Sequence, residues 1–149
     1  RNAYLNLHKL GAVGQKYLED YFGGKSDNPV LRADRLVANW WVNHLHVQNR
    51  PQVDWNDAPI ANTVSSSPDG IPVPQDFYLP DSAIIRLEMP MEFQAMESVD
   101  AVLAARWRDH VRHSFKQLLA AGYLATDFMR VENRVFYVFT RDDKTFKFI

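Results

Sequence analysis

Residues 97–122 read ESVDAVLAARWRDHVRHSFKQLLAAG, and this stretch decides the fold class. Its apolar side chains recur every three or four positions: Val99, Leu103, Trp107, Val111, Phe115 and Leu118. This spacing predicts an amphipathic helix about five turns long. We expect Ser98 to cap the helix at its N-terminus, with Asp100 in the first turn, and Gly122 to end it.

The sequence on either side of this helix predicts strands. Residues 83–89 alternate in character and end at Pro90, which is typical of a strand. Residues 124–130 and 135–140 predict an antiparallel hairpin with its turn at Glu132-Asn133. Residues 141–149 predict a short edge strand through Phe146 and Phe148. A strand, a helix and a hairpin in this order form an α+β unit.

The N-terminal third predicts a helix over residues 1–10, closed by Gly11, and then a strand around residues 15–18. Turn residues follow at 23–29, and a second strand is expected from Leu36 to Val42. Because Trp40 and Trp41 fall on opposite faces of that strand, we expect both of its faces to be covered and the strand to be central in the sheet.

Six of the eight prolines lie between residues 48 and 82, which divides the chain into three parts. Residues 1–47 supply a helix and strands, residues 48–82 a proline-rich connection, and residues 83–149 the strand–helix–hairpin unit. The connection is expected to lie along the surface of the protein, either as a linker or as a lid over a ligand. The overall expectation is an α+β fold: a mostly antiparallel, twisted sheet of about six strands with one long helix packed on it.

Composition excludes several classes of function. A chain of 149 residues with 46% hydrophobic and 23% charged residues is long and apolar enough for a core, as in ordinary globular domains. A formal net charge of −1 gives no electrostatic attraction to nucleic acid or to an anionic membrane. The absence of cysteine excludes disulfides and thiolate chemistry. We therefore expect a cytoplasmic protein with neither nucleic acid nor membrane as a partner.

The first twelve residues carry a family resemblance. Ala3, Lys9 and Gly11 match the pattern Asn-x-x-Ala-x-x-Leu-Tyr-x-Lys-x-Gly-Phe. That pattern resembles the helix after the fifth strand in the GNAT superfamily of N-acyltransferases. Leu7 stands where the superfamily often has the tyrosine that protonates the leaving thiolate, and Ala12 stands where it has phenylalanine. More broadly, residues 1–13, 34–40 and 105–128 resemble the C-terminal half of a subgroup of longer, predicted GNAT-type acyltransferases.

The resemblance implies that the chain is the C-terminal portion of an acyl-CoA-dependent N-acyltransferase acting on a small amine or amino acid. Its donor would be acetyl-CoA or another acyl-CoA. The superfamily's phosphate-cradling motif, Gln/Arg-x-x-Gly-x-Gly/Ala, does not occur in this sequence, so this portion is expected to be inactive by itself.

Five residues are candidates for the site on this reading. Tyr4, one helical turn before the superfamily's tyrosine, is the candidate catalytic acid. Arg1 and Asn2 are the candidates for cofactor binding. Trp41 and Trp55 are the candidates for substrate binding, against the more usual role of tryptophan in filling core and boundary positions.

Other polar clusters have two readings each. Arg108, Arg112 and Lys116 form a cationic stripe, either for coenzyme A phosphates or as a solvated face on which Asp109 pairs locally. His44 and His46 would share one side of an extended segment near Asp54 and Asp57, but without tight ligand spacing, so no metal is predicted.

Two further histidines, His8 and His110, lie on the predicted helices. His110 is either a base or, as we expect, a packed and hydrogen-bonded histidine. For His8, a favourable contact with the end of the helix suffices. The alternative function is a non-catalytic ligand-binding or dimerisation module. It would use the Trp107 face of the helix, or the aromatic strand at residues 135–139, to pair with a second copy as a homodimer.

Overall fold

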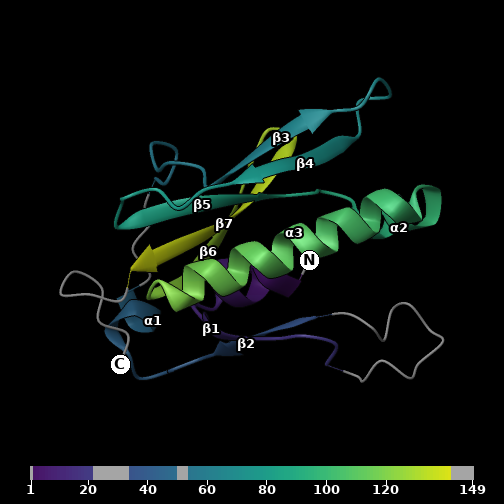
Figure 1. Cartoon of the computed structure of the whole chain (residues 1–149). Helices are drawn as coiled ribbons and strands as arrows, with labels where there is room; N and C mark the ends of the chain where they lie inside the picture. The colour runs from purple at the N-terminus through teal and green to yellow at the C-terminus, as the bar shows by residue number, and fades with distance from the viewer. Residues whose placement is uncertain (1, 22–33, 50–53, 142–149) are drawn as a thin grey trace.

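The computed structural model describes residues 2–21, 34–49 and 54–141 (Figure 1). Within these ranges, five strands form an antiparallel sheet in the order β2-β1-β6-β7-β5. Their bounds are β1 Val13–Leu18, β2 Arg35–Asn39, β5 Ile84–Met89, β6 Tyr123–Val131 and β7 Arg134–Arg141. The predicted α+β class is confirmed. The sheet has five strands rather than about six, and a separate two-stranded sheet lies beside it.

Helix α3 (Ala101–Ala120) packs along one face of the five-stranded sheet (Figure 1). The ring of Phe115 is its central contact, with centroids 5.2 Å from Tyr17, 5.0 Å from Tyr137 and 5.0 Å from Phe139. Trp107 and Leu118 on the same stripe are fully buried. The predicted helix is therefore confirmed, and its apolar stripe is the surface that joins it to the sheet.

The start of α3 differs from the prediction. A short helix, α2 (Phe93–Val99), precedes it and was not predicted. Asp100 is the N-cap of α3, because its side chain accepts a hydrogen bond from the amide of Leu103 at 2.9 Å. Ser98 lies inside α2, where its hydroxyl donates to the carbonyl of Gln94. The chain turns at Asp100, so Val99 falls outside the stripe and is 78% exposed.

The predicted hairpin of β6 and β7 is confirmed, with Glu132 at φ 52° in its turn. A bulge interrupts β6: Ala125 lies opposite Phe139, and Asp127 opposite Val138, so Thr126 is the extra residue. Side chains alternate along β7, and Phe139 faces α3. Val138 and its partner Asp127 therefore lie on the other face of the sheet.

The N-terminal helix is confirmed. It continues from residues 2–3 into a π-helical segment, η1 (Tyr4–Lys9), and ends at Gly11, whose φ of 72° suits glycine. It lies beside β6.

The prediction that residues 36–42 form a central strand is wrong. β2 stops at Asn39 and, among the described strands, lies at the edge of the sheet, where it pairs with β1. Trp40 is 51% exposed, and Trp41 packs on Val13 and Leu124 from beyond the strand end. The alternating sequence pattern that predicted a strand covered on both faces therefore extends beyond the residues that pair with β1.

The described part of the proline-rich segment has structure of its own. α1 (Leu45–Asn49) runs into its start, and it contains a hairpin of β3 (Asn62–Ser66) and β4 (Pro72–Phe77) that packs beside α3 (Figure 1). Prolines at 72 and 74 argue against a strand in the sequence. They are accommodated because β4 is an edge strand of a two-stranded sheet, where a missing N–H is tolerated. Their carbonyls bind α3: Trp107 Nε1 donates to Pro72 O at 2.9 Å, and Arg106 Nη2 to Pro74 O at 3.4 Å.

The hairpin is also tied to the main sheet through Asn62. Its side-chain amide donates to the carbonyl of Glu88 at 3.0 Å and accepts from the amide of Glu88 at 2.8 Å. The Asn62 side chain thereby bonds the backbone of β5 as a neighbouring strand would, on the edge that does not pair with β7.

Two predicted features, the turn at 23–29 and the strand through Phe146 and Phe148, lie outside the described residues. Among the helices of the described ranges, none combines the length and the apolar character that crossing a membrane requires.

We predict that Asp100→Ala lowers the free energy of unfolding by about 1 kcal/mol, because α3 loses the acceptor for its first-turn amide. Ser98→Ala is the matched control and should have little effect, since Ser98 caps no helix. Urea denaturation of both variants measures the difference. Equal effects, or a larger effect of Ser98→Ala, would contradict the assignment of the cap.

Candidate functional site

Two side chains from distant segments, His8 and Trp55, contact Asp127. His8 Nδ1 lies 2.9 Å from Asp127 Oδ1, and Trp55 Nε1 donates to Asp127 Oδ2 at 2.8 Å. Tyr4 stacks on the His8 ring, with centroids 4.7 Å apart and the planes inclined by 24°. We call Tyr4, His8, Trp55 and Asp127 the Asp127 cluster. It brings together the two candidates Tyr4 and Trp55.

The contacts of Asp127 favour one tautomer of His8. Asp127 Oδ1 also accepts from the amide of Phe128 at 2.7 Å. An ionised carboxylate only accepts hydrogen bonds, so His8 Nδ1 must donate to it. In the neutral imidazole, Nε2 then carries the lone pair. The His8 side chain is 39% exposed and that of Asp127 16%, so the imidazole is more open to solvent than the carboxylate it contacts.

Such a pair can take up a proton. A carboxylate that orients an imidazole and stabilises its charged form is the arrangement that makes histidine a general base. The bulge at Thr126 places Asp127 on the face away from α3, where η1 brings His8 to it. The backbone of β6 therefore sets the position of the pair.

Sequence reasoning missed Asp127, and it gave His8 no chemical role. The two residues are 119 positions apart, so spacing along the chain carries no signal for their contact. The available signal was a carboxylate within a strand that is otherwise apolar at Leu124, Phe128 and Met129. A charge in such a strand is rarely buried without a partner.

The remaining candidates lie elsewhere. Asn2 is exposed at the start of the N-terminal helix, and Arg1 lies outside the described residues. Trp41 packs against Val13 and Leu124, and its ring centroid is 6.4 Å from that of His44.

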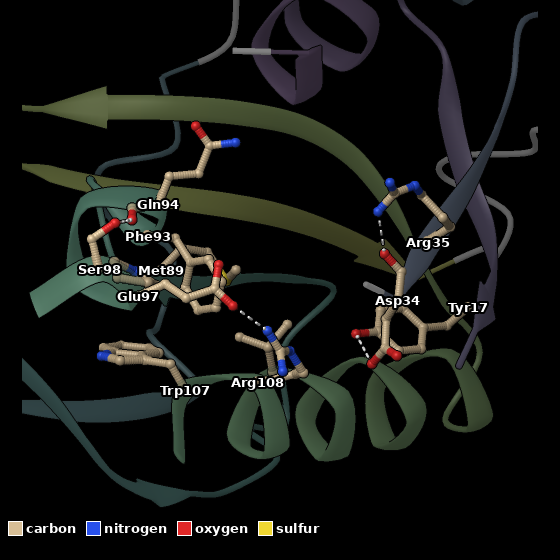
Figure 2. A pocket seen from close by; sticks show the side chains of 12 residues that line it. Tyr17, Asp34, Arg35, Met89, Phe93, Gln94, Glu97, Ser98, Trp107 and Arg108 are labelled. Carbon is tan, nitrogen blue, oxygen red and sulfur yellow. Dashed lines mark hydrogen bonds and ion pairs between the residues drawn. The ribbon is translucent and has the colours of Figure 1, made fainter. Parts of the chain in front are cut away.

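A second feature is a cleft of about 600 Å³ on the α3 side of the sheet (Figure 2). Side chains of α2 line one wall, and Tyr17, Asp34 and Arg35 line the opposite wall. Arg108 projects from α3 between them, and Trp107 lies on the α2 side. Apolar side chains form much of its surface: Met89, Pro90, Phe93, Trp107 and Val111.

Charges around the cleft are paired. Arg112 forms a two-pronged contact with Asp34, with Nε to Oδ2 at 2.8 Å and Nη2 to Oδ1 at 2.7 Å. Tyr17 donates its hydroxyl to Asp34 Oδ2 at 2.8 Å. Arg108 Nη2 donates to Glu97 Oε1 at 3.0 Å.

These contacts decide the role of the predicted cationic stripe. Arg108, Arg112 and Lys116 each form an ion pair with a carboxylate, and the carboxylates are Glu97, Asp34 and Glu19. The partners come from other elements, so the predicted local pairing with Asp109 is wrong. The structure uses the stripe to attach α3 to α2, β1 and the start of β2.

Burial, the largest single influence on Asp34, favours its neutral form. Hydrogen bonds from Arg112, the Asp20 amide and Tyr17 act against burial, and their sum holds the pKa of Asp34 below its usual value. Burial, together with the bond to Asp34, raises the pKa of Tyr17. The cluster of Tyr17, Asp34 and Arg112 is thus stabilised with Asp34 ionised and Tyr17 protonated.

The other histidines have structural surroundings. His44 and His46 lie in a turn and in the short helix α1 rather than on one side of an extended segment. Among the described residues, no group of three or more His, Asp or Glu side chains could hold a metal ion. His110 Nε2 lies 3.1 Å from Asn62 Nδ2, and burial, followed by the charge of His113, lowers its pKa. His110 is therefore packed and hydrogen-bonded, as expected.

Comparisons of the chain with protein-family models, with curated proteins and with solved structures gave no match.

We predict that Asp34→Asn lowers the free energy of unfolding at pH 7 by about 2 kcal/mol, the value of hydrogen bonds to a charged group. Because the pKa of Asp34 is lower in the folded protein than in the unfolded chain, this stability is present above pH ~4 and is lost as the pH falls through the folded pKa. Urea denaturation at pH 7 and at lower pH measures the free energy of unfolding of both proteins. The difference between wild type and Asp34→Asn should become smaller in acid.

Asp109→Asn, an exposed carboxylate on the same helix, is the control and should change little at either pH. If the free energy of unfolding of Asp34→Asn differs from that of wild type by the same amount at pH 7 and in acid, the role of the Asp34 ion pair is contradicted.

Proposed function

We propose that this chain is the C-terminal portion of an acyl-CoA-dependent N-acyltransferase acting on a small amine or amino acid, and that His8 is its general base. The observation that carries the proposal is the contact of His8 Nδ1 with Asp127 Oδ1 at 2.9 Å, with His8 partly exposed. The family resemblance of residues 1–12 supports the reaction class, and the cluster supplies the proton chemistry that this class needs.

The chemistry assigns a task to each member of the cluster. The nitrogen of the acceptor amine attacks the carbonyl carbon of the thioester, a C–N bond forms and the C–S bond breaks. His8 Nε2 takes the proton that the amine loses. Tyr4, stacked on His8, is the candidate that gives a proton to the leaving thiolate.

In this proposal, Trp55 does not have the substrate-binding role that the sequence predicted. Its indole N–H is engaged by Asp127 Oδ2, so Trp55 acts as a positioning residue that orients the carboxylate, rather than as a direct substrate contact. Asp127 in turn orients His8. The two residues therefore act on the substrate through the imidazole.

In this proposal, the acyl donor binds to a part of the parent protein other than this chain. The sequence holds no glycine-rich phosphate cradle, and Arg112 and Lys116 of the cationic stripe are held by Asp34 and Glu19. The chain supplies the base and the acceptor side, and a preceding segment of the parent protein holds acetyl-CoA or another acyl-CoA. The expected location is the cytoplasm.

The test uses the full-length parent protein with acetyl-CoA and a panel of amines and amino acids, with release of the coenzyme A thiol as the readout. His8→Gln is expected to lower kcat by about 100- to 10,000-fold, the usual contribution of general base catalysis, and to leave KM for the acyl donor unchanged. Asp127→Asn should also lower kcat, because an amide can hold the wrong tautomer.

His113→Gln, an exposed histidine on α3, is the matched control and should retain the rate. Failure of the parent to bind any acyl-CoA in calorimetry would remove the proposal. Retention of the wild-type rate by His8→Gln would remove the assignment of the base.

The cleft favours the alternative, a non-catalytic ligand-binding module. Both of the surfaces predicted for dimerisation are occupied by contacts within the chain. β7, which contains the aromatic residues 135–139, lies between β6 and β5, and both of its edges are paired within the sheet. Trp107 is fully buried against the β3–β4 hairpin. A homodimer would need another surface, which sedimentation of the chain would detect.

A further inference from the structure

We propose that the cleft between α2 and the wall formed by Tyr17, Asp34 and Arg35 binds a free amino acid with a large apolar side chain. Its ammonium group would be bound by Glu97 and its carboxylate by Arg108. The cleft volume of about 600 Å³ lies within the range of small-molecule sites and exceeds the size of such a ligand.

The apolar part of the cleft accounts for the side chain of the ligand. Met89 at the end of β5, Phe93 in α2 and Val111 in α3 are partly exposed and line the cleft, with the fully buried Trp107 beside them. Aromatic and thioether groups of this kind favour contact with an aromatic ring or a branched aliphatic chain.

The ion pair of Glu97 and Arg108 accounts for the charged end of the ligand. A single contact, Arg108 Nη2 to Glu97 Oε1, joins the two groups, and the structure gives Glu97 Oε2 and Arg108 Nη1 no partner among the described residues. The side chains are 26% and 27% exposed. A carboxylate and a guanidinium that lie side by side and partly exposed match the opposite pair of charges on a zwitterion.

Charge balance favours a zwitterion over an anion. Two carboxylates, Asp34 and Glu97, and two guanidinium groups, Arg35 and Arg108, line the cleft. A strongly anionic ligand such as a nucleotide would meet the carboxylates, whereas a molecule with one charge of each sign adds no net charge. Figure 2 shows Glu97 and Arg108 projecting toward each other beside Phe93, which places the charged end of the ligand next to the apolar lining.

This site is separate from the Asp127 cluster. Asp127 lies on the face of the sheet opposite α3, whereas α3 forms part of the cleft. Binding in the cleft is measured without any acyl donor, so its failure would leave the acyl-transfer proposal standing, and the reverse also holds.

The test is calorimetric titration of the chain with three ligands: L-phenylalanine, N-acetyl-L-phenylalanine, which lacks the ammonium charge, and L-phenylalaninamide, which lacks the carboxylate. L-phenylalanine is expected to bind with a Kd of about 0.1 mM, in keeping with a ligand of its size. Each analogue should bind about tenfold or more weakly, because it loses one charge-assisted hydrogen bond.

Two variants make the test specific to the ion pair. Glu97→Gln should weaken L-phenylalanine while leaving the N-acetyl analogue unaffected, and Arg108→Gln should weaken L-phenylalanine while leaving the amide unaffected. Asp109→Asn on α3 is the control and should bind like wild type. Absence of saturable binding of L-phenylalanine up to about 10 mM, or equal binding of all three ligands, would overturn the proposal. Because the ligand series needs no substitution, misfolding of a variant cannot obscure the result.

Discussion

Burial of the apolar stripe of α3 against one face of the five-stranded sheet is the constraint on which the rest of the structure depends. Phe115 contacts aromatic rings of β1 and β7 at once, so the helix fixes the relative positions of strands from both ends of the chain. Trp107, nearer the start of α3, joins the β3–β4 hairpin to the same helix. Ion pairs to α2 and to Asp34 then surround this apolar contact with polar ones.

Covering one face with α3 separates the molecule into two chemical environments. On the helix side, the paired charges and the apolar lining of the cleft favour binding of a small molecule. On the opposite face, the bulge at Thr126 places Asp127 where η1 and Trp55 can contact it. In the proposed function, Asp127 orients His8 so that the imidazole serves as the general base.

Features set by local pattern could be predicted from the sequence. The helix over residues 101–120, the β6–β7 hairpin and the stop at Gly11 follow from apolar spacing and turn residues within short windows. The cap at Asp100, the edge position of β2 and the proline-containing β4 could not be predicted. They depend on where the chain turns and on which distant strand or helix supplies a hydrogen-bond partner. The site shows the same division: Tyr4 and Trp55 could be predicted as candidates, but Asp127, which contacts Trp55 and His8, could not, because these contacts span the chain.

The most direct test of the central claim is a nitrogen-15 NMR measurement of the His8 imidazole in the folded chain, assigned with His8→Gln. The account predicts that neutral His8 carries its proton on Nδ1, hydrogen-bonded to Asp127, and that Asp127→Asn changes this signal. A neutral His8 with its proton on Nε2, or a His8 signal unaffected by Asp127→Asn, would contradict the account.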